Sequence, residues 1–153
     1  MGKRLAIFAL LILSVALHAD KTDEETQEPE KGRIEVRLAS LRNHKGLIHC
    51  SLFHSKEGFP EDYTKAYREA TLKADSEKLV FKFDDIPYGQ YAIAVLHDEN
   101  SNKKMDKNFW GIPKEGAGVS NNPEPRRGPP LYSEAVFTLK ADLMRHKIKM
   151  RYP

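Results

Sequence analysis

The sequence contains very little cysteine. Cys50 is the only one among 153 residues, so no internal disulfide can hold the fold together, and stability must come from an apolar core. Cys50 stands in an apolar segment without a CxxC partner or a catalytic cysteine signature. We interpret it as a small buried hydrophobe rather than a reactive thiol.

Long hydrophobic runs are also scarce. The longest covers residues 5–17 and falls short of the roughly 20 residues that a membrane-spanning helix needs. It follows Lys3 and Arg4 and precedes Ala19, an order typical of a secretory signal peptide. We therefore predict a signal peptide over 1–19, export to the periplasm or the extracellular space, and no transmembrane anchor after cleavage.

A strong net charge is missing as well. The formal charge is +3, and loss of Lys3 and Arg4 would lower it to about +1, too little to steer the protein toward nucleic acid or membrane in general. We expect no nucleic-acid partner. A basic strip near the C-terminus has the pattern of a solvent-facing strand; it consists of Arg145, Lys147, Lys149 and Arg151.

The chain therefore divides into a predicted signal peptide, a linker and a domain. Residues 20–32 are rich in acids and have no aromatic or large aliphatic side chain, which is the composition of a flexible linker. Residues 33–153 then suffice for one ordinary domain with a single core. We expect this domain to be a monomer.

The body of the domain reads as a series of short strands. Apolar and polar residues alternate with a period of two, or form short apolar runs, between turn signals. The predicted strands are 33–41, 47–54, 70–74, 78–83, 91–97, 133–139 and 145–151. The strand over 91–97 is apolar on both faces, as a strand covered on both sides should be.

One short helix interrupts these strands. Its apolar stripe has the spacing i, i+3, i+4 and i+7, and Pro60 stands where a first helical turn accepts proline; the stripe is Tyr63, Ala66, Tyr67 and Ala70. The fold prediction is mainly β: a single immunoglobulin-like or transthyretin-like β-sandwich of about seven strands, with one short helix and a long polar loop.

The long loop begins at residue 98 and contains oxygen-bearing side chains at regular intervals. They occupy positions one, three, five and nine of a calcium loop, and a backbone carbonyl at Lys104 would supply position seven. The candidate ligands are Asp98, Asn100, Asn102, Lys104 and Asp106. Lys103 replaces the usual glycine at position six and Phe109 the usual glutamate at position twelve, so we expect only weak calcium binding.

The same residues can also be interpreted as loop-forming residues that bind no metal. Asp and Asn side chains commonly accept hydrogen bonds from backbone amides in successive turns. The loop also supplies candidate surface contacts: His97, Phe109, Trp110, Glu115, Asn121 and Asn122. For His97 we favour a hydrogen-bonded place at the loop base, and for the aromatic pair a role in holding the loop against the sandwich edge.

Several unusual sequence motifs follow one another along the chain. They are YAIAVLHDENSN, FWGIPKEGAGVSNN, RRGPP and the terminal IKMRY. From about residue 34 to residue 152 the chain resembles the bacterial secreted family catalogued as domain of unknown function 2141. The entry into strand 91–97 is more loosely similar to carboxypeptidase regulatory-like and transthyretin-like domains. The resemblance implies an exported β-rich domain and no assigned activity.

The sequence favours a non-enzymatic module over an enzyme. No nucleophile, base and oxyanion donor combine in a recognisable motif. The first hypothesis is an exported cell-envelope module whose loop 98–122 contacts an envelope protein or glycan and is stiffened by calcium. One alternative is a hydrolase or metal-dependent enzyme that uses His97, Asp98, Asp106 and Glu115. A second alternative is a carrier of a small apolar ligand between the sheets.

Overall fold

The computed structural model describes residues 30–76 and 78–153. The predicted signal peptide and most of the predicted linker lie outside the described residues. The first strand begins at Lys31, two residues before the expected start of the domain. Within the described ranges, no helix has the length and apolar character to cross a membrane.

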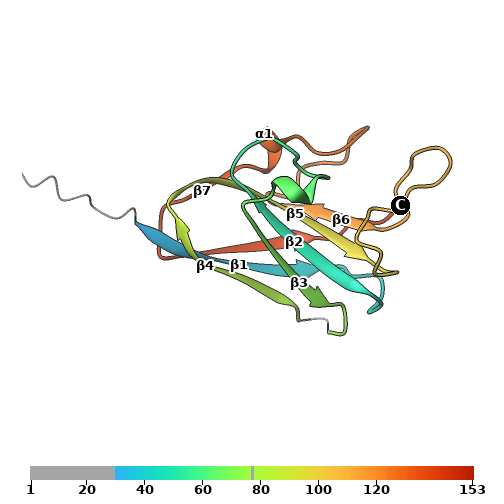
Figure 1. Cartoon of the computed structure of the whole chain (residues 1–153), viewed down its shortest axis with the longest axis horizontal. Helices are drawn as coiled ribbons and strands as arrows, with labels where there is room; N and C mark the ends of the chain where they lie inside the picture. Colours follow the sequence, from blue (N-terminus) through green and yellow to red (C-terminus); the bar gives the residue numbers. More distant parts are fainter. Residues whose placement is uncertain (1–29, 77) are drawn as a thin grey trace, which may run out of the picture.

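In the described part of the chain, eight strands form two sheets (Figure 1). One sheet has the order β4-β1-β8 and the other the order β3-β2-β5-β6, with β7 paired to β5. The strands are β1 (Lys31–Ala39), β2 (Leu47–Phe53), β3 (Arg68–Lys73), β4 (Val80–Pro87), β5 (Gly89–Asp98), β6 (Gly116–Val119), β7 (Phe137–Leu139) and β8 (Leu143–Lys149). The predicted mainly β, two-sheet architecture is confirmed.

The main core lies between the two sheets. Along β1, Ile34 and Val36 are buried while Arg33 and Arg37 face solvent, as the alternating pattern predicts. Cys50 is buried in the same core, and burial raises the pKa of its thiol above the ordinary value. A protonated, enclosed thiol is unreactive, in agreement with the prediction.

β5 is buried along nearly its whole length because both of its faces are covered. Ile93 and Val95 belong to the main core. Ala92 and Ala94, on the other face, belong to a second cluster with Phe53. Packed side chains therefore explain the apolar character of this strand on both faces, and no space between the sheets is needed to account for it.

The prediction of an α-helix after Pro60 is wrong. Only Tyr63–Lys65 form a short 3-10 helix, η1, and Arg68–Lys73 form β3 on the edge of β2. The four residues of the stripe divide between two places, because Tyr63 and Ala66 pack on the second cluster while Tyr67 and Ala70 pack on the main core. Hydrogen bonds offered by the free edge of β2 outweighed the helical spacing.

Two further elements differ from expectation. The predicted strand 133–139 begins instead as a short helix, α1 (Tyr132–Ala135), before β7. The long loop also contains a strand, β6, whose sequence GAGV has no periodic pattern. Gly116 is required there, since a Cβ at this residue would lie 2.1 Å from the ring of Tyr152.

Candidate functional site

The polar loop, residues 98–115, joins β5 to β6 at the end of the sandwich where the C-terminus lies (Figure 1). Its first turn winds around the buried carboxylate of Asp98. Asp98 Oδ1 accepts a hydrogen bond from the N–H of Asn102 at 3.0 Å, and Oδ2 accepts one from the N–H of Lys103 at 2.7 Å. The carboxylate thereby replaces backbone partners that this turn lacks.

A histidine of the neighbouring strand supports Asp98 from within the sheet. His49 Nε2 lies 3.3 Å from Asp98 Oδ2, and His49 Nδ1 lies 2.9 Å from Thr71 Oγ1. Sequence reasoning missed His49, because its meeting with Asp98 depends on the register that pairs Leu47 with Asp98. The only available signal was a polar residue inside an apolar strand.

His97 lies on the opposite face of β5 and is fully buried. Its Nδ1 lies 2.7 Å from the hydroxyl of Tyr152 and its Nε2 lies 2.8 Å from the carbonyl oxygen of Lys45. The predicted place at the loop base is confirmed. The expectation that His97 is a surface contact is wrong, since the C-terminal segment covers it.

Glu115 closes the loop from its far end. The carboxylate accepts hydrogen bonds from the N–H of Glu99 at 2.9 Å and from the N–H of Asp106 at 3.1 Å. The side chain is buried, so Glu115 is not the predicted surface contact. It joins the beginning, middle and end of the loop.

All five predicted metal ligands belong to one hydrogen-bonded set, which Asp98 joins through the N–H of Asn102. The amide groups of Asn100 and Asn102 donate to the two carboxylate oxygens of Asp106, at 2.6 Å and 3.0 Å. Asn102 Oδ1 accepts from the N–H of Lys104 at 2.8 Å. In the described part of the chain, no three His, Cys, Asp or Glu side chains gather in a way that could hold a metal ion.

Lys103 stands in the left-handed region, with φ of 62°. The sharp turn expected at position six therefore forms without glycine, at a cost in backbone strain. The donor set around Asp106 has the chemistry of a hard-cation site only after both amide groups rotate to present their oxygens. Hydrogen bonds among the side chains close the loop by themselves.

The aromatic pair of the loop does not hold it against the sandwich. Phe109 is 93% exposed and Trp110 is 80% exposed. The loop is held instead by Glu115, by an ion pair of 3.0 Å between Lys107 and Glu61, and by Arg42, which donates to the carbonyl oxygen of Lys114. These contacts leave both rings free to meet a partner.

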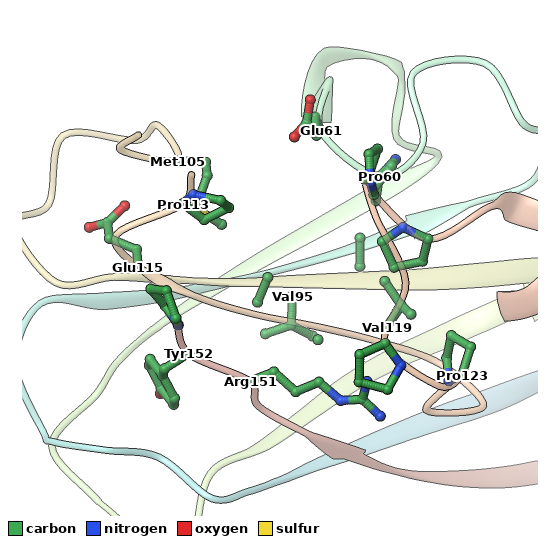
Figure 2. A pocket seen from close by; sticks show the side chains of 18 of the residues that line it. Pro60, Glu61, Val95, Met105, Pro113, Glu115, Val119, Pro123, Arg151 and Tyr152 are labelled. Carbon is green, nitrogen blue, oxygen red and sulfur yellow. The ribbon is translucent and has the colours of Figure 1, made fainter. Parts of the chain in front are cut away.

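A groove of about 510 Å³ lies beside the polar loop (Figure 2). Its walls come from the loop, from η1, from the segment after β6 and from the C-terminus. Figure 2 shows Met105 and Pro113 on one side and Pro60 and Glu61 on another. Seven of the nine prolines line it: Pro60, Pro113, Pro123, Pro125, Pro129, Pro130 and Pro153. Proline walls are stiff, because the ring fixes φ.

Some of the positive side chains that line the groove are paired with an acid, and others are not. Lys107 is paired with Glu61, and Arg126 is paired with Glu134 at 3.3 Å. Lys149 and Arg151 also line the groove, and within the described ranges their side chains have no ion-pair partner. The Arg151 side chain extends along the groove toward the segment that carries Pro123 (Figure 2).

Of the two remaining predicted contacts, Asn121 and Asn122, the second lines the groove. Asn121 and Asn122 are exposed at the end of β6. The side chain of Asn122 donates to the carbonyl oxygen of Lys147 and accepts from the N–H of Lys149. Tyr63 lines the groove from η1, and burial raises the pKa of its hydroxyl to about 12, so the phenol stays protonated at neutral pH.

The four residues of the hydrolase hypothesis do not share a reacting point. His97 and Asp98 project from opposite faces of β5, and both are fully buried. Both oxygens of Glu115 accept backbone hydrogen bonds, and both oxygens of Asp106 accept side-chain hydrogen bonds. The structure uses all four to build the loop.

The fold and the site together define a small β-sandwich domain with a scaffolded loop and a groove at one end. Comparison of the sequence with protein families places it more closely. The family described as "Uncharacterized protein conserved in bacteria (DUF2141)" matches residues 36–147. The match covers most of the chain, and the chain belongs to this bacterial family. Searches of curated proteins and of solved structures gave no match.

Proposed function

We propose that the chain is an exported, non-enzymatic binding module of the bacterial cell envelope, and that the groove beside the polar loop is its binding surface. The groove is the observation that carries the proposal. A volume of about 510 Å³ falls within the range of small-ligand sites. Stiff proline walls lower the entropy lost on binding, since little has to be ordered.

The unpaired cations indicate what the groove would take. Arg151 presents a planar guanidinium, which binds a carboxylate through two parallel hydrogen bonds. Lys149 adds a second positive charge on the same wall. The proposed ligand is therefore a carboxylate-bearing segment of an envelope peptide or glycan, with its apolar part against Pro113 and Val119.

A titration followed by amide NMR spectra tests this proposal. The probes are short peptides with a free C-terminal carboxylate and soluble peptidoglycan fragments. Binding should shift the resonances of groove residues, and Arg151→Gln should weaken it at least about tenfold, the loss of one charged pair. Lys147→Gln, which removes a charge from the exposed face of β8, is the matched control. Shifts that Arg151→Gln leaves unchanged would contradict the proposed site.

Export has its own test. The proposal includes cleavage after Ala19, which the composition of residues 3–19 supports. Expression of the whole chain in a bacterial host should give a periplasmic or extracellular product whose intact mass corresponds to a start at Asp20. A product that keeps residues 1–19 in the cytoplasm would remove the envelope from the proposal and leave the groove as a binding site elsewhere.

We also propose that the polar loop takes calcium weakly, in the millimolar class of extracellular sites. Two carboxylates and two amides support this, while Lys103, Lys104 and Lys107 oppose a cation. Millimolar calcium should raise the melting temperature relative to chelator, because a ligand of the folded state alone stabilises it. Asp106→Asn should abolish the rise with little loss of fold, since Asp106 is partly exposed. Identical melting curves with calcium and with chelator would contradict calcium binding by the loop.

The hydrolase alternative keeps a simple test. Purified protein would have to turn over model ester, glycoside or peptide substrates, and Asp106→Asn would have to abolish that turnover. The burial of His97 and Asp98 speaks against this alternative. A carrier of an apolar ligand would use the groove, which lies beside β6.

A further inference from the structure

The tip of the polar loop carries three apolar side chains into solvent. Phe109 is 93% exposed, Trp110 80% and Ile112 50%. The two rings touch each other edge to face, with centroids 5.3 Å apart. Single exposed apolar residues are common on proteins, but three within four positions at the end of one loop form a contiguous patch that calls for a partner.

The loop presents this patch in a fixed shape. Asn108 Oδ1 accepts hydrogen bonds from the N–H of Trp110 at 2.9 Å and of Ile112 at 3.0 Å. The N–H of Asn108 donates to the carbonyl oxygen of Ile112 at 2.8 Å, and Gly111 takes the positive φ that the turn requires. The tip is therefore a built turn that projects its side chains outward.

The exposed, unpaired charges of the polar loop are positive. Lys103, Lys104 and Lys114 are exposed, and in the described part of the chain none of them has an ion-pair partner. The loop's acids are turned inward or already bound: Asp98 and Glu115 are buried, Glu99 is paired with Arg42, and Asp106 accepts from two amides.

We propose that this tip, formed by Phe109, Trp110 and Ile112, docks onto a membrane surface of anionic lipid together with the exposed lysines of the same loop. Aromatic side chains prefer the boundary between water and acyl chains, where the rings contact apolar matter and the backbone remains hydrated. Lysines beside them gain from the negative potential of anionic headgroups. The inference goes beyond the proposed function, because the two aromatic rings of the tip do not line the groove; of the three tip residues, Ile112 also lines it.

The observed geometry favours lipid over the other partners that bind aromatic residues. The planes of the two rings lie at 83° to each other, so they offer no common flat platform on which a sugar could stack. Lysine is depleted at protein interfaces relative to the rest of the surface. A hydrogen-bonded apolar tip on a loop that also exposes three lysines matches an anionic bilayer better than a sugar or a protein interface.

The chain supplies its own reporter, since Trp110 is its only tryptophan. The protein from Asp20 onward, which contains both sheets, would be mixed with vesicles of phosphatidylcholine and phosphatidylglycerol. Trp110 emission should shift to the blue as the ring leaves water. Vesicles of phosphatidylcholine alone should bind at least about tenfold more weakly, and added salt should weaken binding to the anionic vesicles.

Three variants separate the contributions. Phe109→Ser with Ile112→Ser keeps the reporter and should reduce affinity roughly tenfold or more. Lys103→Gln with Lys104→Gln should reduce it similarly for anionic vesicles only. The control is Lys82→Gln with Lys147→Gln, which removes equal charge from the exposed positions of β4 and β8 and should change affinity less than about twofold. Far-ultraviolet spectra would verify that each variant is folded.

Several results would overturn the proposal. They are an unchanged Trp110 emission with anionic vesicles, an equal loss of affinity in the Lys82 and Lys147 control, or a blue shift produced by soluble glycan or protein fragments without vesicles. Arg151→Gln should bind vesicles like the parent chain. If the protein binds vesicles but no groove ligand, only the membrane proposal stands. If it binds a groove ligand but no vesicles, only the proposed function stands.

Discussion

Glu115 should be the single side chain on which the shape of the polar loop most depends. Its buried carboxylate accepts two backbone hydrogen bonds, from Glu99 at 2.9 Å and from Asp106 at 3.1 Å. Hydrogen bonds to a charged group contribute about 1.5–3 kcal/mol each. Glu115→Gln keeps one acceptor oxygen but turns an N–H₂ group toward the other backbone N–H.

The expected loss for Glu115→Gln is about 2–4 kcal/mol in the free energy of unfolding, from one lost charged hydrogen bond and one buried N–H without an acceptor. This is a large part of the 5–15 kcal/mol typical of a domain. Urea unfolding measures it, and hydrogen exchange should show faster exchange at the amides of Glu99 and Asp106.

Glu124→Gln is the matched control. Glu124 lines the same groove but is exposed, and it has no hydrogen bond or ion pair in the described ranges. Its substitution should change stability by less than about 0.5 kcal/mol. If Glu115→Gln costs no more than this control and the amides of Glu99 and Asp106 stay protected, the role assigned to the carboxylate is refuted.

Three further predictions concern the loop and the C-terminal strand. Lys103→Gly should stabilise the domain by about 0.5–1 kcal/mol in urea unfolding, because glycine accepts φ of 62° without strain; an unchanged midpoint would contradict a strained loop. Burial lowers the pKa of His146, so the unfolded state takes up more protons below its ordinary pKa of 6.5. Unfolding free energy should therefore fall with acid below that pH, by at most about 1.4 kcal/mol per pH unit, and His146→Phe should flatten the profile; parallel profiles would contradict this. Gly116→Ala should displace the ring of Tyr152 and lower the melting temperature by several degrees, roughly 1–3 kcal/mol; a melt like that of the parent chain would contradict the close approach.

Strand positions followed from the sequence wherever one face of a strand is buried. The alternation of Ile34 and Val36 with arginines, and of Ile48 and Cys50 with polar neighbours, fixed β1 and β2 to within two residues. The failures have a common cause. Helical spacing in residues 63–70 was satisfied equally well by a 3-10 turn and an edge strand, and the choice depended on the free edge of β2.

The candidate site was predicted in part. The spacing of Asp98, Asn100, Asn102 and Asp106 correctly marked residues that meet in space. It gave no means to tell hydrogen bonding from metal binding, because both use the same oxygens at the same intervals. Glu115 was recognised as a residue of interest, but its inward direction depends on the strand that follows it.

The sequence by itself determined the local features of this protein. These are the alternation of apolar and polar residues that forms strands, the polar loop, and the family to which the chain belongs. Tertiary structure alone decided what lies beside what. It joined His49 to Asp98 and Tyr152 to His97 across about 50 positions of the chain. It also gathered seven prolines and Arg151 from four segments into one groove. Such contacts depend on register and on sheet packing, which no local pattern encodes.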